Sequence, residues 1–283
     1  MQLITHTMPA SFNLFPFGDI HLGTILHYGR GVAKLIDKME SFYDGIPPRH
    51  NYGINMGDTL EAITLDDERY DPAICKNFPL EQMKDAIELL RPIKKKLLCM
   101  LYGNHEKKLM RFGNLTEWMA QKLDVPYGTF SAKLTYVDRK GRLLFKHFVT
   151  HGRKSINSIA DDPIRRIANL KLILKKHLKY KAGDAILMCK GHTHKLLVSK
   201  PESELYLTDD TRKLSQAYTT SDHTQNFIHP DHRWYVNTGS FYRLYELGVS
   251  GYAEEADYDP IAQGFAVVRV RDRIIVGIDQ VEV

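Results

Sequence analysis

The chain has 283 residues, of which 43% are hydrophobic and 26% charged, so it holds enough apolar material for one large globular domain. Its net charge of +5 is mild. That balance suits a protein that meets anionic substrates and argues against the concentrated basic character of a dedicated nucleic-acid-binding module. The cysteines are sparse and form no CxxC pair, which argues against a disulfide framework and a cysteine-based zinc site; they are Cys75, Cys99 and Cys189.

The N-terminal segment does not read as a targeting signal. It contains no lysine or arginine before Arg30, and its apolar stretch is interrupted by Asn13 and Pro16. No uninterrupted apolar run approaches the roughly 20 residues that are required to cross a bilayer. We therefore expect a cytoplasmic protein without a membrane partner, and the sequence leaves its oligomeric state open.

The predicted elements alternate between strand and helix at first and become rich in strands later. The first strands are expected over 11–17, 52–56 and 97–102, and each is followed by a helix, over 31–43, 80–90 and 107–122. Next come a hairpin over 134–137 and 143–150, a lysine-rich helix over 163–178 and a strand over 185–189. The last third is expected to form strands over 196–199, 234–236, 241–247, 264–270 and 274–281.

This order of elements favours an α/β sandwich, in which two mixed β-sheets pack together and are flanked by helices. We expect a single domain over residues 1–283. Residues 201–232 are polar and irregular, so they are predicted to form a loop insertion.

Five short polar motifs follow predicted strands, at the ends where open α/β folds place their sites. In chain order they are Gly18-Asp19-Ile20-His21-Leu22-Gly23, Gly57-Asp58, Gly103-Asn104-His105-Glu106, His151-Gly152 and Gly191-His192-Thr193-His194. Residues i and i+2 of an extended chain point the same way, so the Asp-x-His and His-x-His pairs can each converge. Carboxylates and imidazoles are ligands of Zn, Mn and Fe, and an amide oxygen is a weaker supplement. One such motif is a weak signal, but five in this order predict a metal site.

The series of motifs resembles the calcineurin-like metallophosphoesterase family. The motifs span residues 18–194, and the Asn237-Thr238-Gly239-Ser240 turn resembles the closing segment of the family. The resemblance implies the four-layer fold of that family and a centre of two divalent metal ions that activates water against a phosphate ester. Mn is favoured on family grounds, and Fe and Zn also suit the mixed ligands.

The resemblance further implies a role for each motif residue. Asp19, His21 and His194 would hold the first metal; Asn104, His151 and His192 would hold the second; Asp58 would bridge both. His105 would be the catalytic histidine that stabilises the phosphoryl group or protonates the leaving oxygen. The alternative for His105 is that it only orients Asn104.

The favoured substrate is a phosphodiester of nucleic acid or of a nucleotide-like molecule. The first and last motifs resemble those of the DNA-repair nucleases in the family. Glu106 departs from that branch, which commonly carries aspartate there, and no long coiled-coil or capping region follows. Arg30, Arg153 and Arg243 lie near motif ends and are weak candidates for contacts to phosphate, although a solvated surface charge explains each more simply.

Two other functions stay open from the sequence. The Gly103-Asn104-His105-Glu106 form also resembles serine/threonine phosphatases, which favours a phosphomonoesterase or protein phosphatase, but Tyr102 stands where those enzymes place an arginine. A non-catalytic scaffold with the same fold is the third alternative. Scaffolds of this kind lose several ligands, whereas every expected ligand is present here.

Overall fold

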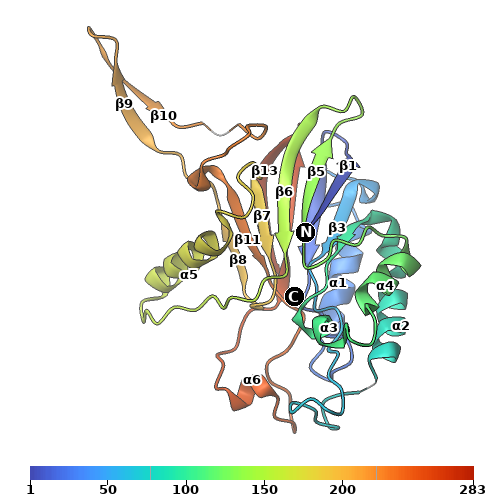
Figure 1. Cartoon of the computed structure of the whole chain (residues 1–283). Helices are drawn as coiled ribbons and strands as arrows, with labels where there is room; N and C mark the ends of the chain where they lie inside the picture. Colours follow the sequence, from blue (N-terminus) through green and yellow to red (C-terminus); the bar gives the residue numbers. More distant parts are fainter. Residues whose placement is uncertain (77, 221) are drawn as a thin grey trace.

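The computed structural model describes residues 1–76, 78–220 and 222–283. It contains two mixed β-sheets that pack face to face, with helices on both outer sides (Figure 1). The predicted α/β sandwich with two mixed sheets is thereby confirmed.

The first sheet has six strands in the order β1-β5-β6-β7-β11-β8. Its strands are β1 (Gln2–Thr7), β5 (Ser131–Val137), β6 (Leu143–Thr150), β7 (Leu187–Lys190), β11 (Trp234–Thr238) and β8 (Leu196–Ser199). Strands β6, β7 and β11 are parallel neighbours, whereas β5 with β6 and β11 with β8 are antiparallel. The central parallel strands therefore end at the same edge of the sheet.

The second sheet has five strands in the order β13-β12-β2-β3-β4. They are β13 (Ile274–Glu282), β12 (Gly264–Arg271), β2 (Phe12–Phe17), β3 (Asn51–Asn55) and β4 (Leu97–Met100). Strands β2, β3 and β4 run parallel to one another, and β12 runs antiparallel to β2. Strand β2 is buried along its whole length because it lies inside this sheet and both of its faces are covered.

The side chains of β2 show how the layers are arranged. Phe12 and Leu14 belong to the apolar cluster between the two sheets, whereas Phe15 and Phe17 belong to the cluster under the outer helices. This alternation is the period of two expected of a strand. Hydrophobic material on both faces of one strand thus holds three of the layers together.

Helices cover the outer face of each sheet. On the second sheet they are α1 (Gly29–Met39), α2 (Pro79–Leu90) and α4 (Leu115–Leu123). The first sheet is covered by α5 (Pro163–Leu178; Figure 1). This helix packs through Leu174 and Leu178. The short elements are α3 (Asn104–Leu109), α6 (Tyr252–Glu255) and three 3₁₀ turns, Pro48–His50, Arg91–Lys96 and Pro230–His232. No helix in the described part of the chain is both long enough and apolar enough to cross a membrane.

Two predicted elements were wrong in detail. The helix expected over 107–122 is two helices, α3 and α4, because Gly113 has a φ of +134° and the Asn114 side chain caps the second helix. The strand expected over 241–247 is a chain of turns with isolated bridges. Gly239, with a φ of +77°, turns the chain out of the sheet directly after β11.

The segment 201–232, predicted to be an irregular loop, contains a hairpin. Strands β9 (Leu205–Asp209) and β10 (Leu214–Tyr218) pair only with each other and project from the sandwich (Figure 1). Nearly all of their residues are exposed. Ser221, within the same segment, lies outside the described residues.

We expect the free energy of unfolding to fall in acid because of one buried histidine. His147 is fully buried between the sheets, and burial lowers its pKa to about 3 from 6.5. The unfolded chain therefore binds one more proton than the folded chain between these values. The contribution is complete above pH 6.5 and is lost as the pH falls toward 3, at roughly 1.4 kcal/mol per pH unit.

Urea unfolding of the wild type and of His147→Leu, measured at several pH values in this range, tests the expectation. The free energy of unfolding of the wild type minus that of the variant should fall as the pH falls, because the variant has no histidine at this position to take up a proton. A difference that stays constant over the range would contradict it.

Candidate metal centre

The five predicted motifs meet at one edge of the sandwich. They follow β2, β3 and β4 of the second sheet and β6 and β7 of the first, each within three residues of the end of its strand. The ends of parallel strands lie side by side, and the two sheets pack face to face. Residues as far apart in sequence as His21 and His194 therefore come into contact.

The titratable side chains form three overlapping groups. Within each group the nitrogen and oxygen atoms that could bind a metal lie within 4.8 Å of one another. The groups are Asp19, His21 and His194; His21, Asp58 and His105; and Asp58, His151 and His192. Because His21 and Asp58 each belong to two groups, the three form one continuous centre.

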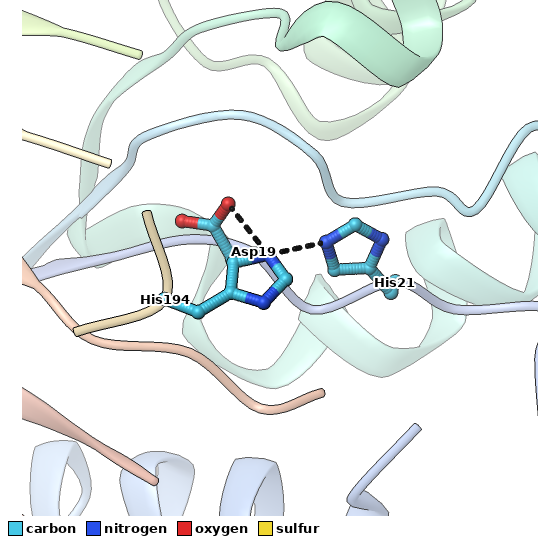
Figure 2. A group of neighbouring side chains, drawn as sticks. All are labelled: Asp19, His21 and His194. Atoms are coloured by element: carbon cyan, nitrogen blue, oxygen red, sulfur yellow. Dashed lines mark hydrogen bonds and ion pairs between the residues drawn. The ribbon is translucent and has the colours of Figure 1, made fainter. Parts of the chain in front are cut away.

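At one end of the centre, two imidazoles and a carboxylate converge (Figure 2). The Nε2 atoms of His21 and His194 are 3.1 Å apart, and the Nε2 of His194 is 3.5 Å from Oδ1 of Asp19. Asp19 and His21 are buried, and His194 is 9% exposed. Three donor atoms that face one another in a buried position are suited to hold one divalent cation.

At the other end, an amide joins the titratable groups. The Nε2 of His151 lies 2.9 Å from Oδ1 of Asn104 and 3.2 Å from Oδ2 of Asp58. The ring of His192 is 5.3 Å from that of His151, measured between ring centroids. This second set places an amide oxygen, a carboxylate and two imidazoles together, with Asp58 between it and the first set.

The backbone is strained at most of these positions. Asp19, His21, Asp58, His192 and His194 all have φ values between +48° and +74°. Such values are uncommon for residues other than glycine and cost of order 1–3 kcal/mol each where they are not relieved. Five such residues in a single cluster indicate that the fold holds these side chains in place for a purpose other than stability.

A second layer of contacts fixes the orientation of the histidines. Nδ1 of His21 lies 2.7 Å from the Glu61 carboxylate, and Nδ1 of His105 lies 2.5 Å from the Glu61 carbonyl oxygen. Nδ1 of His151 lies 2.9 Å from the carbonyl oxygen of Met56. Because each Nδ1 donates its proton outward, each Nε2 faces the centre and can bind a metal once it carries no proton.

Glu106 joins the second and third motifs. Its buried carboxylate accepts four backbone N–H groups, at distances of 2.7–3.2 Å, from Asp58, Thr59, Leu60 and Gly103. The chain passes so close here that a Cβ on Gly103 would lie 2.0 Å from Oδ1 of Asp58. Asp58 is therefore positioned by the residues of the third motif.

The charge of the metal-free centre follows from burial and from neighbouring groups. Burial raises the pKa of Asp58, but the positive charges of His151 and His105 outweigh it and hold that pKa well below its usual range. Burial lowers the pKa of His151, yet the carboxylates, first that of Asp58, raise it to about 9. Burial, with the His151 charge, lowers the pKa of His192 to about 4. A cation binding at neutral pH thus finds ionised carboxylates and must displace a proton from His151.

No family model matches the chain, and no curated protein matches it.

The centre itself fits divalent cations. Asp19 and Asp58 are both buried, and the neighbouring charges that lower their pKa values are those that histidines can carry. Buried carboxylates are costly unless they are paired or bind a metal. The donor set of carboxylate, imidazole and amide suits Mn, Fe or Zn.

The three arginines named from the sequence are not brought together. Arg30 is exposed in the first turn of α1, and Arg153 is exposed two residues after His151. Arg243 forms an ion pair with Glu246 and donates to the carbonyl oxygen of Ile25, so both of its terminal nitrogens are already occupied.

Sequence reasoning missed three contributors to the centre. Glu61 and Glu106 act on residues far from themselves in sequence, and the ring of Tyr242 packs 4.8 Å from that of His21. For Glu106, its place at the end of the third motif was a usable signal. Glu61 and Tyr242 lie two or three residues beyond a motif, after Asp58 and Ser240, but no spacing rule marks them as part of the centre.

Proposed function

We propose that this chain is a two-metal phosphoesterase of the calcineurin-like type, and that it hydrolyses phosphodiesters of nucleic acid or of nucleotide-like molecules. One observation carries the proposal. The carboxylate of Asp58 belongs to two of the groups at once, one that contains His21 and one that contains His151 and His192, as a carboxylate that bridges two metals would.

In this proposal the ligands divide as the resemblance implies. Asp19, His21 and His194 would hold one cation; Asn104, His151 and His192 would hold the other; Asp58 would contact both. Two cations bound there would acidify a water molecule and neutralise phosphate oxygens during an in-line displacement.

The other residues orient the substrate and move protons. His105 directs Nδ1 to the Glu61 carbonyl, so its Nε2 is available to a phosphate oxygen or to the leaving group. Its backbone N–H donates to Oδ1 of Asp58 over 2.9 Å, which ties its position to the bridging carboxylate. Glu61 contacts both His21 and His105, so one residue orients a ligand and the proposed acid.

The proposal is tested by hydrolysis of two simple esters. Mn-loaded protein should cleave bis-p-nitrophenyl phosphate in preference to p-nitrophenyl phosphate, and elemental analysis should find about two metals per chain. Chelation should abolish the activity, and re-addition of Mn should restore it. Preference for the monoester would shift the proposal to a phosphomonoesterase. Less than one bound metal and no hydrolysis of either ester would refute it in favour of a scaffold.

Replacing His105 should slow hydrolysis without removing the metals. We expect His105→Gln to lower kcat by ~10²–10⁴-fold, the usual contribution of a general acid, at unchanged metal content. The loss should be greater for an alcohol leaving group than for p-nitrophenolate, which needs no proton. His229→Gln, on the exposed surface, is the matched control. Equal losses for both leaving groups would assign His105 to positioning of Asn104 instead.

A further inference from the structure

One segment has a higher net positive charge than the chain as a whole. Residues 153–181 contain nine lysines and arginines against two aspartates, a net charge of +7, whereas the whole chain has a net charge of +5. The segment consists of the loop after His151 and of helix α5 with the residues that follow it. The charge of the protein is thus concentrated on one side of the candidate metal centre.

Most of these cations are not neutralised by the protein. Lys175 forms an ion pair with Asp231, and the backbone carbonyl of Ala160 accepts from Arg166. The other exposed cations of the segment have no ion-pair partner among the described residues; they are Arg153, Lys154, Arg165, Lys176 and Lys181. Free and exposed cations of this kind are available to a polyanion.

The basic segment is fastened directly to the loop that carries two of the predicted metal ligands. Nζ of Lys190, just before His192, donates to the carbonyl oxygen of Lys154 over 2.9 Å. Nζ of Lys195, just after His194, donates to the carbonyl oxygen of Ile156 and to Oδ1 of Asn157. The positive surface therefore begins at the edge of the centre.

A second stretch beside the centre is rich in acidic residues. Residues 243–259 contain five acidic residues and one arginine. This stretch follows Tyr242, whose ring lies 4.8 Å from that of His21 and 5.5 Å from that of His194. A polyanion approaching the centre is attracted along α5 and repelled by this acidic stretch.

A groove runs between the basic loop and α5. It has a volume of about 370 Å³, and it is lined by Asn157, Ser158, Ile159, Asn169, Leu172 and Ile173. The size falls within the range of about 300–1,000 Å³ that is usual for ligand sites. Its apolar walls suit the face of a nucleobase. Oδ1 of Asn157 accepts from Lys195, and Nδ2 of Asn169 donates to the Ser158 hydroxyl, so Nδ2 of Asn157 and Oδ1 of Asn169 are the amide atoms that suit the edge of the base.

We propose that residues 153–181 form a docking surface for single-stranded nucleic acid, which they lead to the metal centre. The cleavage that follows docking rests on the proposed function, but docking itself requires no metal. Anionic lipid would meet the same cations, but a lipid headgroup carries no aromatic base to occupy the groove between the loop and α5. Nucleic acid supplies both the phosphates and the bases.

The test is binding of fluorescein-labelled oligothymidylate by the full chain in EDTA, where no cleavage occurs. The oligonucleotide has about 20 nucleotides, longer than common single-strand sites of ~4–16. The variant Lys154→Glu/Arg165→Glu/Lys176→Glu reverses three exposed cations of the surface. Its matched control, Lys84→Glu/Lys95→Glu/Lys122→Glu, makes the same change of net charge on the side of α2 and α4. Circular dichroism confirms that both variants are folded.

We expect the first variant to weaken binding at least ~10-fold and to lower the slope of log K against log salt by about 2, as for three lost phosphate contacts. The control should change affinity less than about 2-fold. Three results would overturn the docking surface: equal weakening by both variants, no binding by the wild type, or tighter binding to phosphatidylserine vesicles than to the oligonucleotide.

Hydrolysis of bis-p-nitrophenyl phosphate by the wild type is followed separately. Binding without that hydrolysis would refute the proposed function alone, and hydrolysis without binding would refute the docking surface alone.

Discussion

Asp58→Asn should abolish hydrolysis while leaving the fold intact, with a loss of at least ~10³-fold in kcat, or about 4 kcal/mol of transition-state stabilisation. The asparagine keeps the size of the side chain and can still accept the His105 backbone N–H at Oδ1. It removes the negative charge that lies between the two ligand groups and turns an NH₂ toward Nε2 of His151, 3.2 Å from Oδ2 in the native protein. A cation can no longer be shared there.

The measurement combines elemental analysis with hydrolysis of bis-p-nitrophenyl phosphate. We expect Asp58→Asn to retain no more than about one metal per chain, whereas Asp37→Asn, an exposed aspartate on α1, retains both metals and full activity. Unfolding curves show whether the variant is folded. Wild-type metal content and activity in a folded Asp58→Asn protein would rule out a bridging role.

Glu106→Gln should lower both the free energy of unfolding of the protein and the affinity of the centre for metal. The native carboxylate accepts two N–H groups at each oxygen, from Thr59 and Leu60 at Oε1 and from Asp58 and Gly103 at Oε2. Glutamine supplies one oxygen, and its NH₂ must face the other two donors. Since a buried donor without a partner costs ~1–3 kcal/mol, we expect a loss of roughly 2–5 kcal/mol.

Urea unfolding and metal titration of the same samples test this expectation. Affinity for the second metal added should fall at least ~10-fold, the usual effect of losing a residue that supports a ligand. Glu81→Gln, at an exposed position in the first turn of α2, is the control and should change stability by only a few tenths of a kcal/mol. A stable Glu106→Gln protein with normal metal affinity would show that backbone strain alone holds Asp58 in place.

The layers of the sandwich were predictable because most of its strands are short apolar runs bounded by glycine or polar residues. Strand β2 is an example of such a run. Helix α5 was predictable as well, because its helical pattern agrees with its place in the tertiary structure. Strand β1, Gln2–Thr7, was not predicted, because it lies at the edge of a sheet with several exposed residues and shows no strong apolar pattern. The segment 241–247 was misread as a strand because Gly239 turns the chain out of the sheet and Tyr242 packs beside the histidines.

The sequence predicted those residues of the centre that lie at the ends of strands, but not the residues that support them. The motifs marked which side chains gather, since the ends of parallel strands share an edge. The supporting contacts could not be foreseen, because Glu61 meets His21 across 40 residues of chain and Glu106 meets Thr59 across 47. Such contacts depend on how loops pack and leave no periodic trace in the sequence.

The distance along the chain between the ligands has a consequence for biosynthesis. His21 and His194 contact each other although 173 residues separate them, and the ligands between them come from both sheets. A ribosome-bound chain therefore cannot assemble the centre until β7 and the loop after it have left the exit tunnel and joined the first sheet. Uptake of the proposed metals would therefore follow docking of the sheets. Metals bound there would oppose separation of the sheets, because a ligand bound only to the native state stabilises it by mass action.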